Sequence, residues 1–130
     1  MIKEAYVSFE TAKLLKEKGF DGECSSWYST KGSQYYNIDS YEVDLDGITK
    51  LCSSPTQQMA MQYLRKEHDI HIETKAYPHE DNRFYWCYMI KKMQNNGMLF
   101  GYYSIKNKAG FDTYEEAVEA ALKYCLTNLI

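Results

Sequence analysis

Apolar residues recur at helical spacing near the amino terminus, in residues 8–18. Ser8 is a suitable N-cap, and Gly19 is a suitable C′ residue, where the left-handed conformation favours glycine. The stripe between them consists of Phe9, Ala12 and Leu15. We therefore predict a short helix over residues 8–18.

Two further helices are predicted after residue 53, and each begins with a capping box. In the first, Ser54 stands at the N-cap, Pro55 at the first helical position and Gln57 at the third. In the second, Thr113 is the N-cap and Glu116 occupies the third position. The apolar stripe of this last helix is unbroken: Tyr114, Ala117, Val118, Ala121, Leu122, Cys125, Leu126 and Leu129.

The pattern between these helices is typical of three antiparallel strands. Residues 70–77 alternate, with isoleucines on one face and His71, Glu73, Lys75 and Tyr77 on the other. Residues 83–91 are aromatic on both faces. Residues 99–106 follow Asn96-Gly97, the dipeptide that type I′ hairpin turns favour.

The predicted fold class is therefore α+β. A three-stranded antiparallel sheet carries two helices on one face, because each helix has a single apolar stripe to bury. Residues 21–51 have a weak pattern and are expected to be irregular, with one or two short strands at 27–29 and 34–38. We predict one domain, residues 1–130, in which a helix with a loop or hairpin segment (1–53) joins an αβββα unit (54–130).

Residues 41–55 (YEVDLDGITKLCSSP) carry acidic side chains at alternate positions before a glycine, as the first half of a calcium loop does. A loop that began at Glu42 would require a bidentate glutamate at its twelfth position, where Ser53 stands. Asp46-Gly47 is instead a common type I′ dipeptide. We therefore predict a turn or hairpin here, and no bound calcium.

His68 and His71 form an H-x-x-H pair with Glu67 and Glu73 nearby, so a zinc site must be considered. The helix is expected to end at Asp69, which turns the two histidines apart. A histidine in the last helical turn and a histidine on an open strand face account for the pair without a metal. No phosphate-binding loop, nucleophile elbow or Walker-type motif is present, and we expect no cofactor.

The four cysteines, Cys24, Cys52, Cys87 and Cys125, include no C-x-x-C pair. Charged residues interrupt the first twenty positions, so a secretory signal is not expected. The central uncharged run, FYWCYMI at 84–90, is far shorter than a membrane span. We expect reduced thiols, no membrane association and a cytoplasmic protein.

Thirteen tyrosines in 130 residues are more than a core needs, and they favour half-buried recognition surfaces. The candidate surface is the open sheet face, with His71, Lys75 and Tyr77. To these the middle strand adds Trp86 and Tyr88, or alternatively Tyr85, and the third strand adds Tyr102 or Tyr103. Bases could stack there, although the net charge of −3 disfavours nucleic acid.

The order helix, three strands, helix resembles double-stranded-RNA-binding domains and small toxin nucleases on the same framework. In the RNA-binding domains the last helix begins with lysines that contact phosphates. Here that position holds Glu115 and Glu116, which would repel phosphate.

Three segments resemble a group of small uncharacterised proteins encoded by phages, prophages and mobile elements of gut Bacteroidetes: VSFETAKLLKEKGF (7–20), SPTQQMAMQYLRKEHDIHIE (54–73) and FDTYEEAVEAALKYCL (111–126). The resemblance leaves out residues 21–53 and implies an origin in a phage or mobile element, but no activity. Our leading hypothesis is a non-enzymatic accessory protein that acts by protein–protein contacts with an unknown partner or with itself. The alternatives are a nucleic-acid-binding module and a small nuclease-like enzyme.

Overall fold

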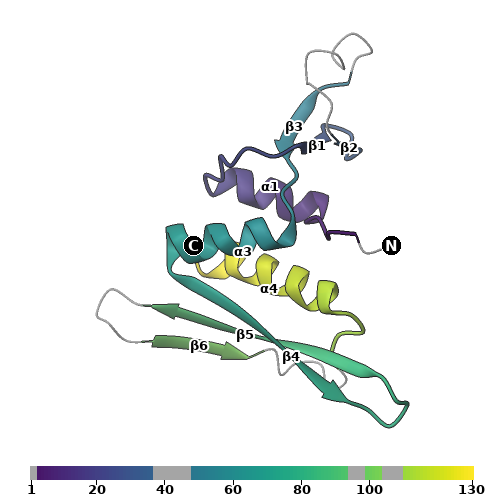
Figure 1. The fold of residues 1–130 in the computed structure, drawn as a ribbon. Coiled ribbons are helices and arrows are strands. Elements are labelled where there is room, and N and C mark those ends of the chain that lie inside the picture. Colours follow the sequence, from purple (N-terminus) through teal and green to yellow (C-terminus); the bar gives the residue numbers. More distant parts are fainter. Residues whose placement is uncertain (1–2, 37–47, 94–98, 104–109) are drawn as a thin grey trace. The chain divides into compact units, whose positions relative to one another are not determined.

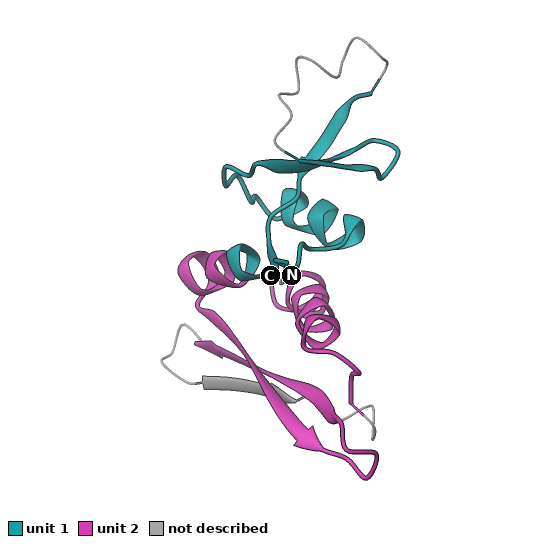
Figure 2. Cartoon of the chain, turned by 45° about the vertical axis from the view of Figure 1, so that its right-hand side comes forward, with its two compact units in different colours: residues 1–60 teal, residues 61–130 magenta. Residues whose placement is uncertain are grey.

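The computed structural model describes residues 3–36, 48–93, 99–103 and 110–130. The elements follow in the order α1 (Phe9–Glu17), β1 (Ser26–Ser29), β2 (Gln34–Tyr36), β3 (Lys50–Ser53), α3 (Gln57–His68), β4 (Ile70–Pro78), β5 (Phe84–Met93), β6 (Leu99–Tyr103) and α4 (Tyr114–Asn128) (Figure 1). The predicted α+β class is confirmed. The chain divides into two compact units, residues 1–60 and 61–130 (Figure 2). That all 130 residues form one domain stays a prediction.

The first helix is confirmed, and both of its ends are satisfied by local chemistry. The Ser8 hydroxyl accepts a hydrogen bond from the Thr11 amide at 3.2 Å, as an N-cap should. At the other end Gly19 has φ 93°, and the amides of Gly19 and Phe20 donate to the carbonyls of Lys16 and Leu15. This is a Schellman motif, which only a residue that tolerates positive φ allows at low cost.

The first unit contains an antiparallel sheet of strand order β2-β1-β3, where the sequence predicted irregular structure with one or two short strands. In the centre of this sheet Trp27 of β1 lies opposite Tyr35 of β2, and their rings stack with centroids 4.7 Å apart. All four residues of β1 are buried, so no apolar–polar alternation marks this strand in the sequence. The Asp46-Gly47 turn predicted beside it lies outside the described residues.

The helix α3 begins two residues later than the capping box at Ser54 predicts. The N-cap is Thr56, whose hydroxyl accepts from the Met59 amide at 3.2 Å. Ser54 instead bonds to Ser26 of β1. The Ser54 amide donates to the Ser26 carbonyl, and the Ser54 carbonyl accepts from the Ser26 hydroxyl. Pro55 accepts a hydrogen bond from the Val7 amide at 3.0 Å. Long-range bonds therefore hold these two residues outside the helix.

The second unit contains the predicted three-stranded antiparallel sheet, in the order β4-β5-β6. The register of β4 on β5 is continuous from the pair Ile70–Lys92 to the pair Pro78–Phe84. One residue, Asp69, joins α3 to β4 and has φ 53°. The Asn96-Gly97 turn predicted between β5 and β6 lies outside the described part of the chain.

The helix α4 packs on β4 and β5, as its sequence stripe predicts. Thr113 is its N-cap and accepts from the Glu116 amide at 3.1 Å. The stripe is completely buried at Ala117, Val118, Ala121, Leu122, Cys125 and Leu126. At its carboxyl end the Lys92 ammonium donates to the Leu129 carbonyl, where a positive charge complements the helix dipole. In the described residues, no helix is long and apolar enough to cross a membrane.

A short bridge connects β5 to the start of α4. The amide and carbonyl of Trp86 bond to the carbonyl and amide of Phe111 at 2.8 and 2.7 Å. Gly110 precedes this bridge with φ 69°, and a Cβ placed on it would lie 2.9 Å from the Trp86 carbonyl oxygen. The position therefore requires glycine for both its backbone angle and its space.

Replacing Gly110 with alanine is expected to lower the free energy of unfolding by about 1–3 kcal/mol. The alanine would be strained at this positive φ, and its Cβ would also clash with the Trp86 carbonyl oxygen. Gly19 offers a matched control: its φ is also positive, but nothing lies within 4 Å of an added Cβ. Gly19→Ala should therefore show only the strain. Urea denaturation followed by circular dichroism measures both, and equal losses would contradict the clash.

Candidate interaction surface

The strand register divides the predicted surface residues between two faces of the β4-β5-β6 sheet. His71, Lys75 and Tyr77 share one face of β4, and their partners on β5 are Lys91, Cys87 and Tyr85. Glu73 and Met89 form the remaining pair of that face. We call these eight residues the outer face. Of the two alternatives open for β5, the structure thus selects Tyr85.

Trp86 and Tyr88 lie on the other face, so their assignment to one surface with His71 is wrong. Trp86 contacts Tyr114 of α4 edge-to-face at 5.5 Å. Tyr88 is only 8% exposed and lies 6.0 Å from the Phe111 ring. Tyr102 pairs with Ile90, two residues along from Tyr88, and therefore shares its register face rather than that of His71. On β6 the position opposite the outer-face residue Met89 is Tyr103.

The outer face carries more positive than negative groups. The Glu73 carboxylate lies 3.2 Å from the Lys91 ammonium and 3.5 Å from the His71 ring. Lys75 is exposed and forms no ion pair with any described residue. Met89 is buried within the face, at 6% exposure.

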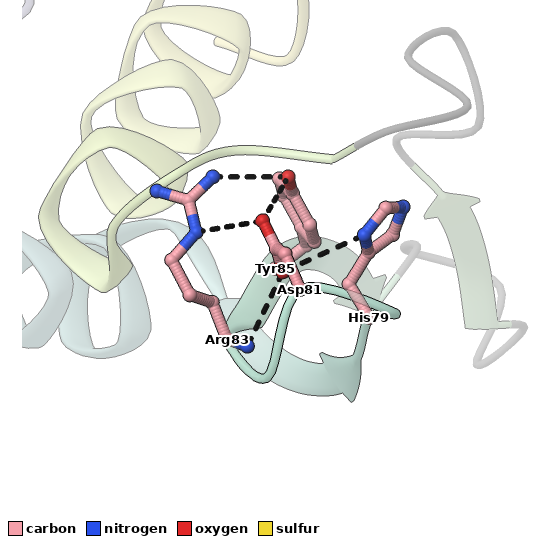
Figure 3. A network of polar contacts seen from close by, with 4 residues as sticks. All are labelled: His79, Asp81, Arg83 and Tyr85. Carbon is pink, nitrogen blue, oxygen red and sulfur yellow. Dashed lines mark hydrogen bonds and ion pairs between the residues drawn. The ribbon is translucent and has the colours of Figure 1, made fainter.

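The outer face ends at the tip of the β4–β5 hairpin, where the sequence did not predict a site. His79, Asp81, Arg83 and Tyr85 lie at every second position there, and we call them the tip cluster (Figure 3). Backbone bonds close the loop: the His79 amide donates to the Arg83 carbonyl at 2.9 Å, and the Asn82 amide donates to the His79 carbonyl at 3.1 Å. Asn82 takes the left-handed conformation, φ 64°, which asparagine tolerates better than most residues.

Asp81 is the hub of the tip cluster (Figure 3). One carboxylate oxygen accepts from the Arg83 amide at 3.2 Å, and the other accepts from Arg83 Nε at 2.9 Å and from the Tyr85 hydroxyl at 3.3 Å. Arg83 Nη2 also donates to the Tyr85 oxygen at 3.1 Å. The His79 ring contacts the Tyr85 ring edge-to-face at 4.5 Å. These bonds hold the guanidinium and the phenol ring in one arrangement.

Within this cluster, Asp81 and Arg83 stabilise each other's charged forms. Desolvation acts to raise the pKa of Asp81, but the hydrogen bonds from Arg83 outweigh it and hold that pKa below its ordinary value of 3.8. Hydrogen bonds to Tyr85 and Asp81 raise the pKa of Arg83. A lowered carboxylate pKa means that the ion pair is complete at neutral pH and is lost only when the pH falls through that lowered value.

Large apolar side chains stand exposed beside this cluster. Phe84 is 60% exposed and Tyr77 is 50% exposed. Tyr77 lies opposite Tyr85, whereas Phe84 lies opposite Pro78 on the other side of the ribbon. Exposed aromatic rings and a positioned arginine are both typical of the centre of a protein–protein interface.

The two histidines of the H-x-x-H pair each contact a neighbouring side chain. His68 Nε2 lies 3.1 Å from the Tyr63 hydroxyl, and His71 pairs with Glu73. Across the described residues, no group of three or more histidine, cysteine or acidic side chains is placed to hold a metal ion.

The cysteines are free thiols, of which Cys52 and Cys125 are buried. Burial raises the pKa of Cys125 to about 12, and the Lys92 ammonium opposes this only in part. Burial likewise raises the pKa of Cys24 and of Cys52. None of these three thiols has the lowered pKa that marks a catalytic cysteine.

Cys125 should therefore resist alkylation in the folded protein. At pH 8 a thiol of pKa about 12 is only about 10⁻⁴ thiolate, and the side chain is also fully covered. Mass spectrometry after treatment with iodoacetamide should find Cys125 unmodified until guanidinium unfolds the chain. Modification of Cys125 in the native protein as fast as of the half-buried Cys87 would contradict the packing of α4.

The tip cluster was missed as a site, although Tyr85 was one of the alternatives for the candidate surface, because His79 and Asp81 lie between the predicted strands 70–77 and 83–91. The available signal was the recurrence of polar or aromatic side chains at every second position, His79, Asp81, Arg83 and Tyr85, where two predicted strands meet. Asp81-Asn82 after Pro78 marks the loop that brings them together.

The chain was also compared with known proteins. No protein-family model, no curated protein and no solved structure matches it.

Proposed function

We propose that this protein is a non-enzymatic accessory protein of a phage or mobile element and acts in the cytoplasm by binding another protein. The contact is made by the β4–β5 hairpin tip, with Phe84, Tyr77 and the tip cluster. The observation that carries this proposal is the 60% exposure of Phe84, which directly follows an arginine that Asp81 and Tyr85 already hold in place.

The chemistry of the tip supports protein binding for two reasons. Burying an exposed phenylalanine or tyrosine against a partner contributes favourable apolar area, about 25 cal/mol per Å². Arg83 and Tyr85 are already ordered by their bonds to Asp81, so less side-chain entropy is lost when a partner covers them. The same bonds leave guanidinium donors available for a partner's carboxylate or carbonyl groups.

The rest of the second unit acts as a scaffold for this tip. We propose that α3 and α4 cover the same sheet face, opposite the outer face, as their single apolar stripes suggest. The rings of Trp86 and Tyr114 and the buried stripe of α4 support this for α4. A rigid sheet that holds a structured hairpin in a fixed position is a suitable scaffold for a binding site.

Site-specific photo-crosslinking tests the proposal. A benzophenone amino acid placed at Phe84 and, in a separate variant, at Met93 compares two exposed positions of the same strand, 60% and 50% exposed. In host cells, the Phe84 probe should give a discrete crosslinked protein that the Met93 probe does not. The captured protein, once purified, should bind the wild-type chain directly. Crosslinks of equal yield from both positions would refute the assignment of the tip.

One observation favours a second candidate function, single-stranded nucleic-acid binding. The outer face combines Lys75, Lys91 and His71 with the rings of Tyr77 and Tyr85. Cations beside stackable rings are typical of surfaces that hold single strands. A labelled oligonucleotide should then shift at low salt and lose affinity as salt rises; the absence of a shift at low salt would exclude this function.

A further inference from the structure

The strand β4 has one edge with which no other described strand pairs. It is a terminal strand of the sheet, and its ladder partner is β5 alone. Its register runs through nine residues without a bulge. An uninterrupted strand edge of this length is a template for pairing with another strand.

The hydrogen-bond alternation identifies which backbone groups face this edge. The Asp69 carbonyl accepts from the Met93 amide at one end, and the His79 amide donates to the Arg83 carbonyl at the other. Hydrogen-bonded pairs recur at every second residue of an antiparallel ladder, so the odd-numbered residues of β4 bond to β5. The amides and carbonyls of the even-numbered residues face outward: Ile70, Ile72, Thr74 and Ala76.

We infer that this edge pairs with β4 of a second copy of the chain, antiparallel and centred on Thr74. Only this register overlaps the whole of Ile70–Pro78 with its copy, because Thr74 is the midpoint of the nine residues. The outward groups of Ile72 then meet those of the partner's Ala76. Pro78 lacks an amide hydrogen, but it falls at the end of the pairing, where only one bond to the partner's Ile70 is lost.

The charges on the outer face are self-complementary in this register. Glu73 lies opposite the partner's Lys75, and Lys75 lies opposite the partner's Glu73. These are non-hydrogen-bonded pairs, in which the Cα atoms approach to about 4.5 Å and side chains interact most strongly. A shift of the centre to Glu73 would instead oppose two glutamates, and a shift to Lys75 would oppose two lysines.

Other features also favour pairing with a second copy of the chain. Lys75 has no ion-pair partner in the described chain, and Glu73, with 33% of its side chain exposed, can accept a further cation. A two-fold axis at Thr74 joins the two sheets into one of six strands with both outer faces on the same side. This inference does not depend on the hairpin tip, because a dimer through the β4 edge forms whether or not Phe84 binds another protein.

Charge exchange between two variants tests the interface. Lys75→Glu and Glu73→Lys each place like charges opposite each other in the homodimer, and each should weaken self-association about tenfold or more. Mixed in equal amounts, the two variants should recover a dimer, because every pair across the interface is again opposite in charge. Lys31→Glu is the matched control: Lys31 is exposed, lies in the first unit, and should leave association unchanged.

Sedimentation velocity over about 1–500 μM measures the association, and circular dichroism checks that each variant is folded. The wild-type chain should reach twice its 15.3 kDa mass as concentration rises. A wild-type chain that stays monomeric, or a mixture of variants that associates no better than either alone, would overturn the inference. Thr74→Pro is the second test: it removes an outward amide and no bond to β5, so it should give a folded monomer. A folded Thr74→Pro dimer would also overturn it.

Discussion

Replacing Leu122 with alanine is expected to lower the free energy of unfolding by about 2–5 kcal/mol. Leu122 is completely buried in the stripe of α4 that faces β4 and β5. Truncating its side chain removes apolar burial and leaves a cavity that the surrounding residues fill only in part. Urea denaturation followed by circular dichroism measures this loss.

Thr127→Ala provides the control for that measurement, because Thr127 is exposed on the same helix. Its effect should stay within about 0.5 kcal/mol. Trp27 lies in the first unit and Trp86 in the second, so the fluorescence of Trp86 in a Trp27→Phe background reports on the second unit. A loss below about 1 kcal/mol for Leu122→Ala would show that α4 does not pack on the sheet.

Replacing Phe84 with alanine is expected to weaken binding of the crosslinked partner by about 30- to 1,000-fold, or about 2–4 kcal/mol, as for an aromatic residue at the centre of an interface. The stability of the chain should hardly change, because Phe84 is already 60% exposed in the free protein. Isothermal titration calorimetry with the purified partner measures the affinity.

Met93→Ala is the matched control for binding, since Met93 is 50% exposed at the opposite end of β5. Its affinity should match that of the wild type. Equal losses for Phe84→Ala and Met93→Ala would mean that general surface hydrophobicity, rather than the hairpin tip, is recognised. An unchanged affinity for Phe84→Ala would place the contact elsewhere.

Features that depend on neighbouring residues were predictable from the sequence. The caps Ser8 and Thr113, the C′ residue Gly19 and the stripe of α4 all act within one or two helical turns, so their signal is complete in a short window. The strands of the second unit were found for a similar reason, because β4 alternates with period two and only five residues separate it from β5.

Features that depend on distant residues were not predictable. Ser54 has the local chemistry of an N-cap, but both its amide and its carbonyl form hydrogen bonds to Ser26, 28 residues away. The helix therefore begins at the next suitable residue, Thr56. The β2-β1-β3 sheet was underestimated because β1 is buried on both faces and its strand pattern is lost.

The side of the sheet on which each candidate residue lies was predicted in part. The alternation of β4 placed His71, Lys75 and Tyr77 together correctly. In β5 aromatic side chains point both ways, so the sequence cannot show which set is buried. The structure resolves this through Trp86, which α4 covers with Tyr114.

The single residue between α3 and β4 determines which insertions this chain can accept. One amino acid added at Asp69, with the joint kept at a single residue, would shift β4 by one position and turn Ile70 and Ile72 into water and His71 and Glu73 toward α4. Two added amino acids would restore the parity and need only a small loop. Length variation at this joint should therefore occur in even steps, whereas residues added between His79 and Arg83 would keep the parity of both strands but separate the side chains of the tip cluster.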